Sequence, residues 1–160
     1  REGRPAAIIA KMNALLEPQI IAALYEASQA GVKIRLIIRG VCALRPGVPG
    51  LSDNIEVRSV VGRFLEHPRV FYFYNDRQED LYIASADWMG RNFFRRIETC
   101  TPVEQGELKA RVIREGLTLA LEDNQQAWLM QPDGSYIRAP FAEGDVPVNL
   151  QNDLWQEFGS

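Results

Sequence analysis

The first 38 residues contain two apolar runs separated by a segment with helical periodicity. Ala6–Met12 is a short, largely apolar run, and Val32–Ile38 is rich in β-branched residues, so both are predicted to be strands. Between them, Pro18 begins a segment whose apolar residues recur at helical spacing until Gly31. The pattern therefore predicts a βαβ unit with two parallel strands.

Further strands are indicated by alternation and by β-prone residues. Ile55–Val61 and Arg69–Tyr74 are predicted strands, and Leu81–Ala84 follows a polar turn at 75–80 as the antiparallel partner of the second. Arg96–Val103 indicates one more strand. A parallel beginning followed by a hairpin predicts an α/β fold, with a mixed β-sheet flanked by helices in a single domain.

The remaining segments are predicted to be loops, one long helix and a tail. Residues 40–54 contain three glycines and two prolines, which indicates an irregular loop, and residues 85–92 indicate a loop or a short helix. Residues 104–126 carry one apolar stripe and are predicted to be an amphipathic helix. A hairpin-like turn is expected at 131–136. Residues 139–160 are expected to be a loosely ordered tail that docks, if at all, through Leu154, Trp155 and Phe158.

Composition supports one folded domain. The chain has 160 residues, of which 46% are hydrophobic and 24% charged. It has no apolar run of about 18 residues and no signal-like beginning, so a cytoplasmic protein without a transmembrane segment is expected. A core strand that begins almost at residue 1 leads us to expect a piece cut from a longer chain.

The net charge of −3 conceals an asymmetry between the two parts of the chain. Residues 1–100 carry 14 Lys and Arg against 11 Asp and Glu, whereas residues 101–160 carry 4 against 10. A local phosphate site in the first part is therefore compatible with the total. Arginine provides 15 of the 18 basic residues, which suits bidentate phosphate contacts but also follows from codon bias.

Few residues are available for metal or disulfide chemistry. Cys42 and Cys100 lack the spacing of a zinc site and are expected to be reduced and half-buried. His67 is the only histidine, so His and Cys residues alone form no metal site here.

Candidate site residues fall at the ends of predicted strands. Arg39 directly follows the second strand, and His67 and Arg69 lie two residues apart, so their side chains point the same way in an extended segment. Cationic groups so arranged suit phosphoryl oxygens, and histidine also exchanges a proton near neutral pH. Ser85 and Asp87 follow the hairpin and are expected to orient such a site.

Structural interpretations of the same residues remain open. Arg39 is also placed to pair with Asp53 or Glu56 at a strand end, and Ser85 and Asp87 also suit a turn or a helix cap. The aromatic run 71–74 is interpreted as alternating core rather than as a surface for stacking bases. No Walker-type glycine loop is present.

Six stretches of the sequence closely resemble the carboxyl-terminal catalytic domain of bacterial polyphosphate kinases that work through a phosphohistidine. They occur in the family's order between about residue 4 and about residue 138 and comprise residues 9–15, 24–34, 38–42, 45–55, 62–67 and 85–92. The resemblance therefore predicts a catalytic domain over residues 1–138, followed by the tail at 139–160.

The resemblance implies a phospholipase D-like half and reversible transfer of the terminal phosphoryl group of ATP to polyphosphate, with Mg²⁺. It implies that the phosphorylated histidine and the Mg²⁺ ligands lie upstream of this chain. His67 matches the family's second active-site histidine, and Arg39 matches an arginine that contacts nucleotide phosphates. Arg69 stands where a phospholipase D pattern has lysine, which weakens the case for independent diesterase activity.

We therefore expect part of an ATP–polyphosphate phosphotransferase that is inactive as an isolated piece. Its expected partners are ATP or ADP, polyphosphate, the rest of the same polypeptide and further copies in a homo-oligomer, but not nucleic acid; peripheral membrane association is compatible with this. Arg39, His67 and Arg69 are expected to bind phosphate, with Ser85 and Asp87 in support. The alternatives are a stand-alone phospholipase D-type phosphodiesterase and a non-catalytic polyphosphate-binding module.

Overall fold

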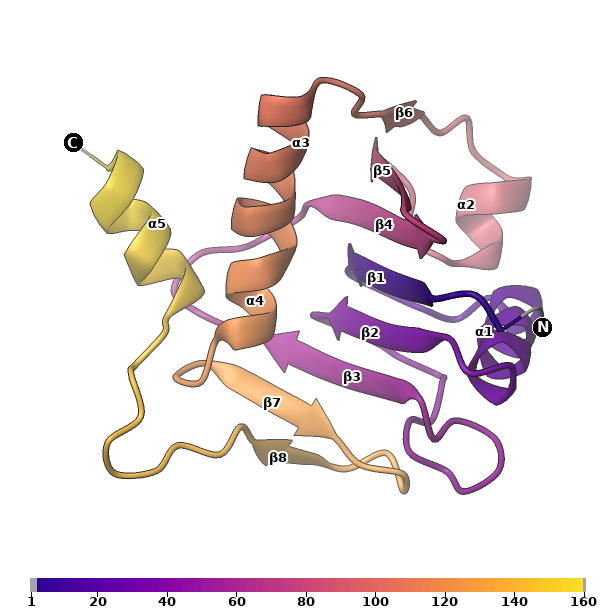
Figure 1. The fold of residues 1–160 in the computed structure, drawn as a ribbon, viewed down its shortest axis with the longest axis horizontal. Coiled ribbons are helices and arrows are strands. Elements are labelled where there is room, and N and C mark those ends of the chain that lie inside the picture. The colour runs from indigo at the N-terminus through magenta and orange to yellow at the C-terminus, as the bar shows by residue number, and fades with distance from the viewer. Residues whose placement is uncertain (1–2, 160) are drawn as a thin grey trace.

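The computed structural model describes residues 3–159, and within them one mixed sheet of eight strands runs through the molecule (Figure 1). The strand order is β6-β5-β4-β1-β2-β3-β7-β8, with β1, β2 and β3 parallel and all other neighbours antiparallel. The strands are β1 (Ala6–Met12), β2 (Lys33–Ile38), β3 (Ile55–Val60), β4 (Arg69–Asn75), β5 (Gln78–Ala84), β6 (Cys100–Pro102), β7 (Ala127–Met130) and β8 (Tyr136–Arg138). The predicted mixed sheet flanked by helices is confirmed.

The predicted βαβ unit consists of β1, helix α1 (Pro18–Gln29) and β2. Pro18 suits the first turn of the helix, where its missing N–H leaves no hydrogen bond unmade. The chain turns at Gly31, whose φ of 92° is a conformation that favours glycine. Strand β2 then pairs with β1 in parallel, with Ala7 opposite Lys33.

Residues 39–54 connect β2 to β3 without a helix, in agreement with the irregular loop predicted there. Leu44 is completely buried. The Ser52 hydroxyl donates to the carbonyl oxygen of Arg45 at 2.7 Å and accepts the N–H of Val48 at 2.9 Å. These contacts give the loop a defined path between the two strands.

The hairpin of β4 and β5 has a tighter turn than the sequence predicts. Asp76 and Arg77 have φ values of 45° and 74°, the left-handed conformations of a two-residue turn between twisted strands. Strand β5 therefore begins at Gln78, and the turn predicted over 75–80 was too long. The polar residues at 78–80 belong to the strand because their backbone pairs with β4 while their side chains are exposed.

The segment after β5 contains less strand than predicted. Helix α2 (Gly90–Phe94) is the short helix allowed for this region, and β6 covers only three of the residues in the strand predicted over 96–103. The preceding residues are held differently, because Glu98 accepts hydrogen bonds from Ser85 and Asn92 instead of lying in the ladder. Cys100 in β6 is exposed, contrary to the prediction, whereas Cys42 is half-buried and free, and its burial raises the pKa of its thiol.

The long amphipathic helix is present, with a π-helical middle. It consists of α3 (Gly106–Val112), the π-helical segment η1 (Ile113–Thr118) and α4 (Leu119–Glu122), with Leu117 and Ala120 completely buried. It ends four residues before the predicted end at Gln126. The reason is Asp123, whose buried carboxylate accepts the N–H groups of Gln125 and Gln126 and turns the chain into β7.

The carboxyl-terminal part is more structured than the sequence pattern suggests. Strands β7 and β8 flank the predicted turn at 131–136 but were not predicted as strands. Helix α5 (Leu150–Phe158) lies in the segment expected to be a loosely ordered tail, and Leu150 is completely buried. The proposed domain boundary at residue 138 stays a prediction.

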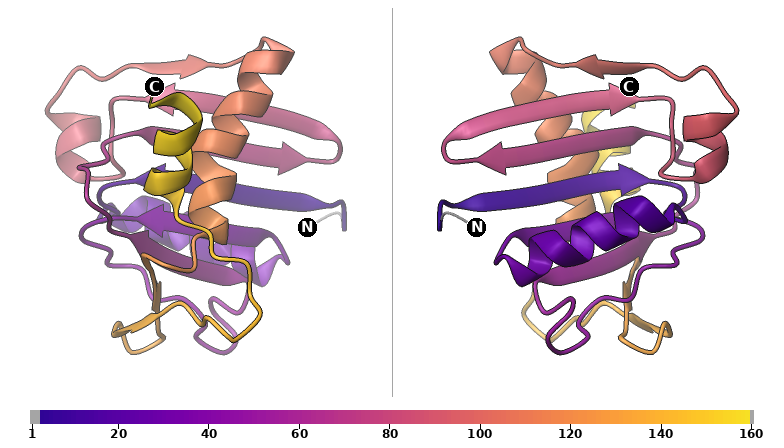
Figure 2. Two further views of the ribbon diagram at one scale, coloured as in Figure 1. Left: turned by 90° about the vertical axis from the view of Figure 1, so that its left-hand side faces the viewer. Right: turned by 90° about the vertical axis from the view of Figure 1, so that its right-hand side faces the viewer.

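The sheet is covered on both faces, as the two views in Figure 2 show. Helix α1 lies on one face, and α3, η1, α4 and α5 lie on the other. Two apolar clusters accordingly fill the interior, one around Leu24 and Leu36 and one around Leu117 and Leu150. Among residues 3–159, no helix is both long and apolar enough to span a bilayer.

Candidate functional site

A pocket of about 500 Å³ opens where strands β1, β2 and β5 end and β4 begins. In the right-hand view of Figure 2, α2 lies on the side of the sheet where β1 and β2 end. The pocket is lined by all five residues singled out from the sequence, namely Arg39, His67, Arg69, Ser85 and Asp87. The structure thus brings these residues together from three connections of the sheet, while their individual functions stay predictions.

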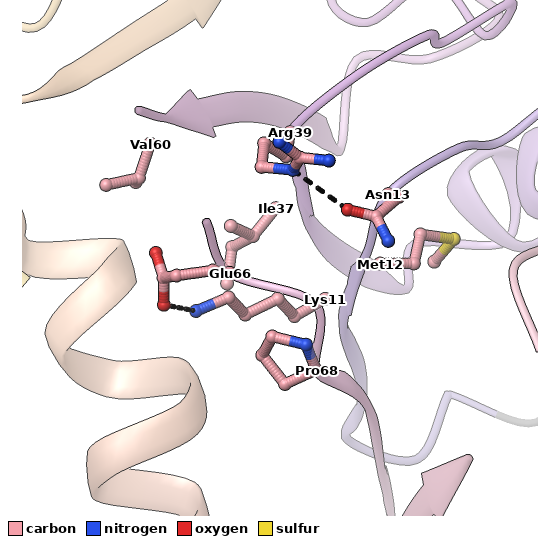
Figure 3. A pocket seen from close by; sticks show the side chains of 8 residues that line it. All are labelled: Lys11, Met12, Asn13, Ile37, Arg39, Val60, Glu66 and Pro68. Carbon is pink, nitrogen blue, oxygen red and sulfur yellow. Dashed lines mark hydrogen bonds and ion pairs between the residues drawn. The ribbon is translucent and has the colours of Figure 1, made fainter. Parts of the chain in front are cut away.

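Asn13, which directly follows β1, links Arg39 to His67. Arg39 Nε donates to Asn13 Oδ1 at 2.9 Å (Figure 3), and Asn13 Nδ2 lies 2.6 Å from His67 Nδ1. A guanidinium only donates hydrogen bonds, so the amide oxygen must face Arg39 and the amide NH₂ must face His67. His67 Nδ1 is then the acceptor, and the neutral ring carries its proton on Nε2.

This arrangement leaves donors for a ligand. Among residues 3–159, neither terminal nitrogen of Arg39 donates a hydrogen bond to the protein, so both remain for an anion. The Nε2–H group of His67 is not used by the contact to Asn13 either. Arginine and imidazole donors at one pocket suit the oxygens of a phosphate group.

Asp87 and Arg69 form a buried ion pair beneath these groups. Arg69 donates from Nε to Asp87 Oδ1 at 3.1 Å and from Nη2 to Asp87 Oδ2 at 3.0 Å, and Asp87 Oδ1 also accepts the N–H of Asn13 at 2.7 Å. Burial raises the pKa of Asp87, but the hydrogen bonds from Arg69 and from the Asn13 backbone outweigh it, so the pKa lies below its ordinary value. The carboxylate is charged at neutral pH and ties β1 to β4 at the site.

Arg69 is thereby largely committed to the protein. Besides the two bonds to Asp87, its Nη1 donates to the carbonyl oxygen of His67 at 3.2 Å. Only 11% of its side chain is exposed. The geometry favours a positioning function for Arg69, which orients Asp87 and the backbone at His67; its predicted phosphate contact stays a prediction.

A second carboxylate orders the far side of the pocket. Glu98 accepts hydrogen bonds from the Ser85 hydroxyl and, at 2.6 Å, from Asn92 Nδ2. The hydrogen bonds from Ser85 and then Asn92 lower the pKa of Glu98. Ser85 therefore acts on the pocket through Glu98 and through the N–H of Thr99, which its hydroxyl accepts at 3.0 Å.

Sequence reasoning missed several residues of the pocket. Asn13 lies one residue beyond β1, and the rule that selected Arg39 at the end of β2 applies to it equally. Arg91, Asn92, Arg96 and Glu98 line the pocket from α2 and the chain after it, where the sequence pattern carries no comparable signal. The side chains of Arg91 and Arg96 make no hydrogen bond within the described part of the chain.

The residues of this pocket do not fit a metal site. No group of three or more His, Cys, Asp or Glu residues within 3–159 is arranged to hold an ion. The two carboxylates of the pocket already accept hydrogen bonds from the protein, Asp87 from Arg69 and Glu98 from Ser85 and Asn92. The donors available for a ligand are cationic or N–H groups, which bind anions.

The chain is similar over nearly its whole length to one family. The family model described as polyphosphate kinase C-terminal domain 2 matches residues 1–151. A polyphosphate kinase of Neisseria meningitidis serogroup B is 66% identical over 99% of this chain, and one of Burkholderia ambifaria is 66% identical over 100%. The chain spans 23% of the length of each of these relatives.

Solved structures agree with the sequence matches. The crystal structure of polyphosphate kinase from Porphyromonas gingivalis superposes with a TM-score of 0.92 at 38% identity, covering 98% of this chain and 24% of that one. Nuc from Salmonella typhimurium, a phospholipase D family member, superposes with a TM-score of 0.56 at 14% identity, covering 86% of this chain and 85% of that one. The latter likeness concerns the fold alone, which agrees with the predicted phospholipase D-like half.

Proposed function

The chain belongs to the polyphosphate kinase family, in which it matches the second carboxyl-terminal domain, and from this premise we propose that its pocket binds phosphate groups of ATP and polyphosphate during phosphoryl transfer. The observation that carries the proposal is the hydrogen-bonded series Arg39–Asn13–His67, which directs unused donors of a guanidinium and an imidazole into one pocket. Transfer of a phosphoryl group depends mainly on positioning and on stabilisation of charge.

We assign stabilisation of charge to Arg39 and donation of a hydrogen bond to His67. The terminal nitrogens of Arg39 bind oxygens of the transferred group, whose negative charge they offset. The Nε2–H group of His67 donates a hydrogen bond to the phosphoryl oxygens or to the oxygen that ADP retains when the terminal phosphorus–oxygen bond breaks, and the proton stays on the neutral ring. The same hydrogen bond serves the reverse direction, in which ATP forms. Arg91 and Arg96 add positive charge at the mouth for the polymer.

His67 is oriented as a donor and not as the nucleophile. An imidazole that attacks phosphorus needs a lone pair on the attacking nitrogen. Nε2 of His67 carries the proton as long as Asn13 donates to Nδ1. We therefore propose that the phosphorylated histidine belongs to the rest of the polypeptide, as the resemblance implies. Mg²⁺ neutralises phosphate charge when it accompanies a nucleotide, and we propose that its protein ligands lie in that same part.

The test uses the full-length enzyme that contains this chain, with transfer of labelled phosphate from ATP to polyphosphate as the measurement. His67→Ala should lower kcat by about a hundredfold or more, the usual loss when one hydrogen-bond donor to the developing charge is removed. Arg39→Ala should lower kcat/KM for ATP. Arg35→Ala is the matched control, because Arg35 is an exposed arginine of β2, the strand that Arg39 follows, and lies outside the pocket; it should leave both constants unchanged.

Two outcomes would contradict the proposal. Normal turnover by the His67→Ala enzyme, with unchanged thermal unfolding, would exclude His67 from the chemistry. Hydrolysis of bis(p-nitrophenyl) phosphate that depends on His67 in the 160-residue chain alone would favour the phospholipase D-type alternative, whose fold this chain shares.

A further inference from the structure

His67 lies at the end of a loop that has little regular structure of its own. Residues 61–68 connect β3 to β4, and most of them are exposed. Phe64 and Leu65 in particular are 45% and 74% exposed. The loop therefore has no apolar core that would hold His67 against Asn13, and its position depends on contacts with other elements.

Helix α5 provides the most extensive of these contacts. Gln151 Oε1 accepts the N–H of Phe64 at 2.8 Å, and Gln151 Nε2 donates to the carbonyl oxygen of Phe64 at 2.9 Å. One side-chain amide thus pairs with both backbone groups of one loop residue. The ring of Trp155, one turn further along α5, stacks on the ring of Phe64 with centroids 5.6 Å apart and planes inclined by 18°.

Glycine at position 62 makes room for the contact between Gln151 and the loop. A Cβ atom at Gly62 would lie 2.4 Å from Gln151 Oε1 and 2.6 Å from its Cδ, closer than real contacts allow. The φ of Gly62 is not in the left-handed region, so the backbone itself does not require glycine there. The absence of a side chain at Gly62 lets the Gln151 amide lie against the loop.

Glu66, directly before His67, is held from two sides. Its Oε1 accepts from Lys11 Nζ of β1 at 2.9 Å (Figure 3), and its Oε2 lies 3.4 Å from Gln151 Nε2. The Lys11 side chain is only 8% exposed, so its charge requires this partner. The loop is thereby fixed to the sheet on one side and to α5 on the other.

Helix α5 is itself anchored to the body of the domain. The N–H of Leu150 donates to the buried carboxylate of Asp123 at 2.9 Å, and Glu157 forms an ion pair with Arg114 of η1 at 2.7 Å. Asn149 caps the helix by accepting the N–H of Asn152 at 3.1 Å. A continuous series of contacts therefore runs from η1 and α4 through α5 to the loop and His67.

We propose that α5 is a positioning element for the site, in which Gln151 and Trp155 hold residues 61–67 so that Asn13 sets the tautomer of His67. The proposal rests on the proposed function only for its effect on turnover. Without Gln151 the loop fluctuates, His67 leaves Asn13 for part of the time, and the imidazole populates its second tautomer. Gln151 and Trp155 touch no reacting atom and act through the loop.

The first experiment measures the tautomer of His67 without any activity assay. His67 is the only histidine of the chain, so the imidazole ¹⁵N spectrum of the 160-residue protein contains one ring. With a neutral ring, the unaltered protein should give widely separated Nδ1 and Nε2 shifts, with the proton on Nε2. In Gln151→Ala and in Gly62→Ala the two shifts should move toward each other.

A matched control separates this effect from general loosening of the helix. Gln156 lies on the same helix, is exposed, and has no hydrogen-bonded side chain within residues 3–159. Gln156→Ala should therefore keep the shifts of the unaltered protein. Unchanged ¹⁵N shifts in both Gln151→Ala and Gly62→Ala would overturn the proposal, and so would shifts that move equally in Gln156→Ala.

The second experiment measures turnover in the full-length enzyme. Gln151→Ala and Gly62→Ala should lower kcat about fivefold, the change that about 1 kcal/mol makes in a rate, while KM for ATP stays within about twofold. Movement of the shifts with unchanged kcat would confirm that α5 positions the ring and would contradict the proposed catalytic function of His67. The two proposals therefore fail in different measurements.

Discussion

Asn13 contacts three residues of the pocket although it carries no charge and has no proton to transfer. Its amide bonds a donor and an acceptor at the same time, because its oxygen accepts from Arg39 Nε and its nitrogen faces His67 Nδ1. Its backbone N–H simultaneously donates to Asp87. Each polar atom of this residue beyond its carbonyl thus has a separate partner, and each partner belongs to a different connection of the sheet.

The stability contributed by Asp87 should depend on pH in a defined direction. The pKa of its carboxyl is lower in the folded chain than its ordinary value of about 3.9, so the charged form stabilises the fold above that pH and the contribution is lost as pH falls through the folded pKa. Asp87→Asn removes the charge that Arg69 requires. We expect the free energy of unfolding to fall by about 3 kcal/mol at neutral pH.

Urea unfolding at neutral pH and at progressively lower pH measures this difference. The gap between the unaltered protein and Asp87→Asn should begin to narrow below about pH 3.9, where the Asp87 carboxyl of the unfolded chain takes up a proton, and should close as pH falls through the lower pKa of the folded chain. Asp80→Asn, an exposed carboxyl of β5, should match the unaltered protein at every pH. A gap that stays constant from neutral to acid pH would contradict the assigned ion pair.

The sequence predicted some of the charged residues that line the pocket and missed others, such as Arg91 and Arg96. Arg39 and His67 were singled out because strand ends are visible in the pattern and because ligand sites in such sheets lie at strand ends. Asn13 was missed because an uncharged amide at a strand end has no chemical signature. Glu98 was placed within a predicted strand, and its actual position depends on hydrogen bonds to Ser85 and Asn92 that no periodicity encodes.

At the scale of elements, the strong periodic patterns were reliable and the short elements were not. The βαβ unit and the long helix each bury a continuous apolar stripe, which dictates their type. Strands β7 and β8 contain four and three residues, too few for alternation to be distinguished from chance. They form because β7 pairs with β3 and β8 pairs with β7, which is information about tertiary structure.

Asp123 connects three segments of the chain by hydrogen bonds, so its replacement should destabilise the folded protein. Its carboxylate accepts N–H groups from Gln125 at 3.0 Å, Gln126 at 2.6 Å and Leu150 at 2.9 Å, at the end of α4, before β7 and at the start of α5. Asp123→Ala leaves these donors without that acceptor in a buried place. We expect the free energy of unfolding, measured with urea, to fall by about 3 kcal/mol.

Glu122→Ala is the matched control, because Glu122 ends the same helix but is exposed, and its carboxylate accepts no hydrogen bond within residues 3–159. Its free energy of unfolding should stay within about 0.5 kcal/mol of the unaltered value. If Asp123→Ala cost no more than this control, the carboxylate would not be what ends α4 and holds α5.

For the whole molecule, the distribution of charge matters more than its sum. The net charge is −3, yet the pocket gathers Arg39, Arg91 and Arg96, while the acidic excess lies in residues 101–160. Because the field at a concave site is set by the groups around it, an acidic protein can still bind a polyanion there. All residues of this pocket come from one family domain, and the chain spans only 23% of the length of its relatives.

The 160-residue chain alone should therefore bind phosphate chains without transferring phosphate. We expect calorimetry with inorganic tripolyphosphate to detect weak binding that declines as salt is raised, because charges at an open pocket are screened. Arg39→Ala should remove most of this binding, whereas Arg138→Ala, whose side chain lies over Trp128 outside the pocket, should retain it. Equal binding by both variants would contradict the assigned site.

Sustained synthesis of polyphosphate from ATP by this chain alone would contradict the proposal that the nucleophilic histidine lies elsewhere, because His67 would then have to serve as both nucleophile and donor.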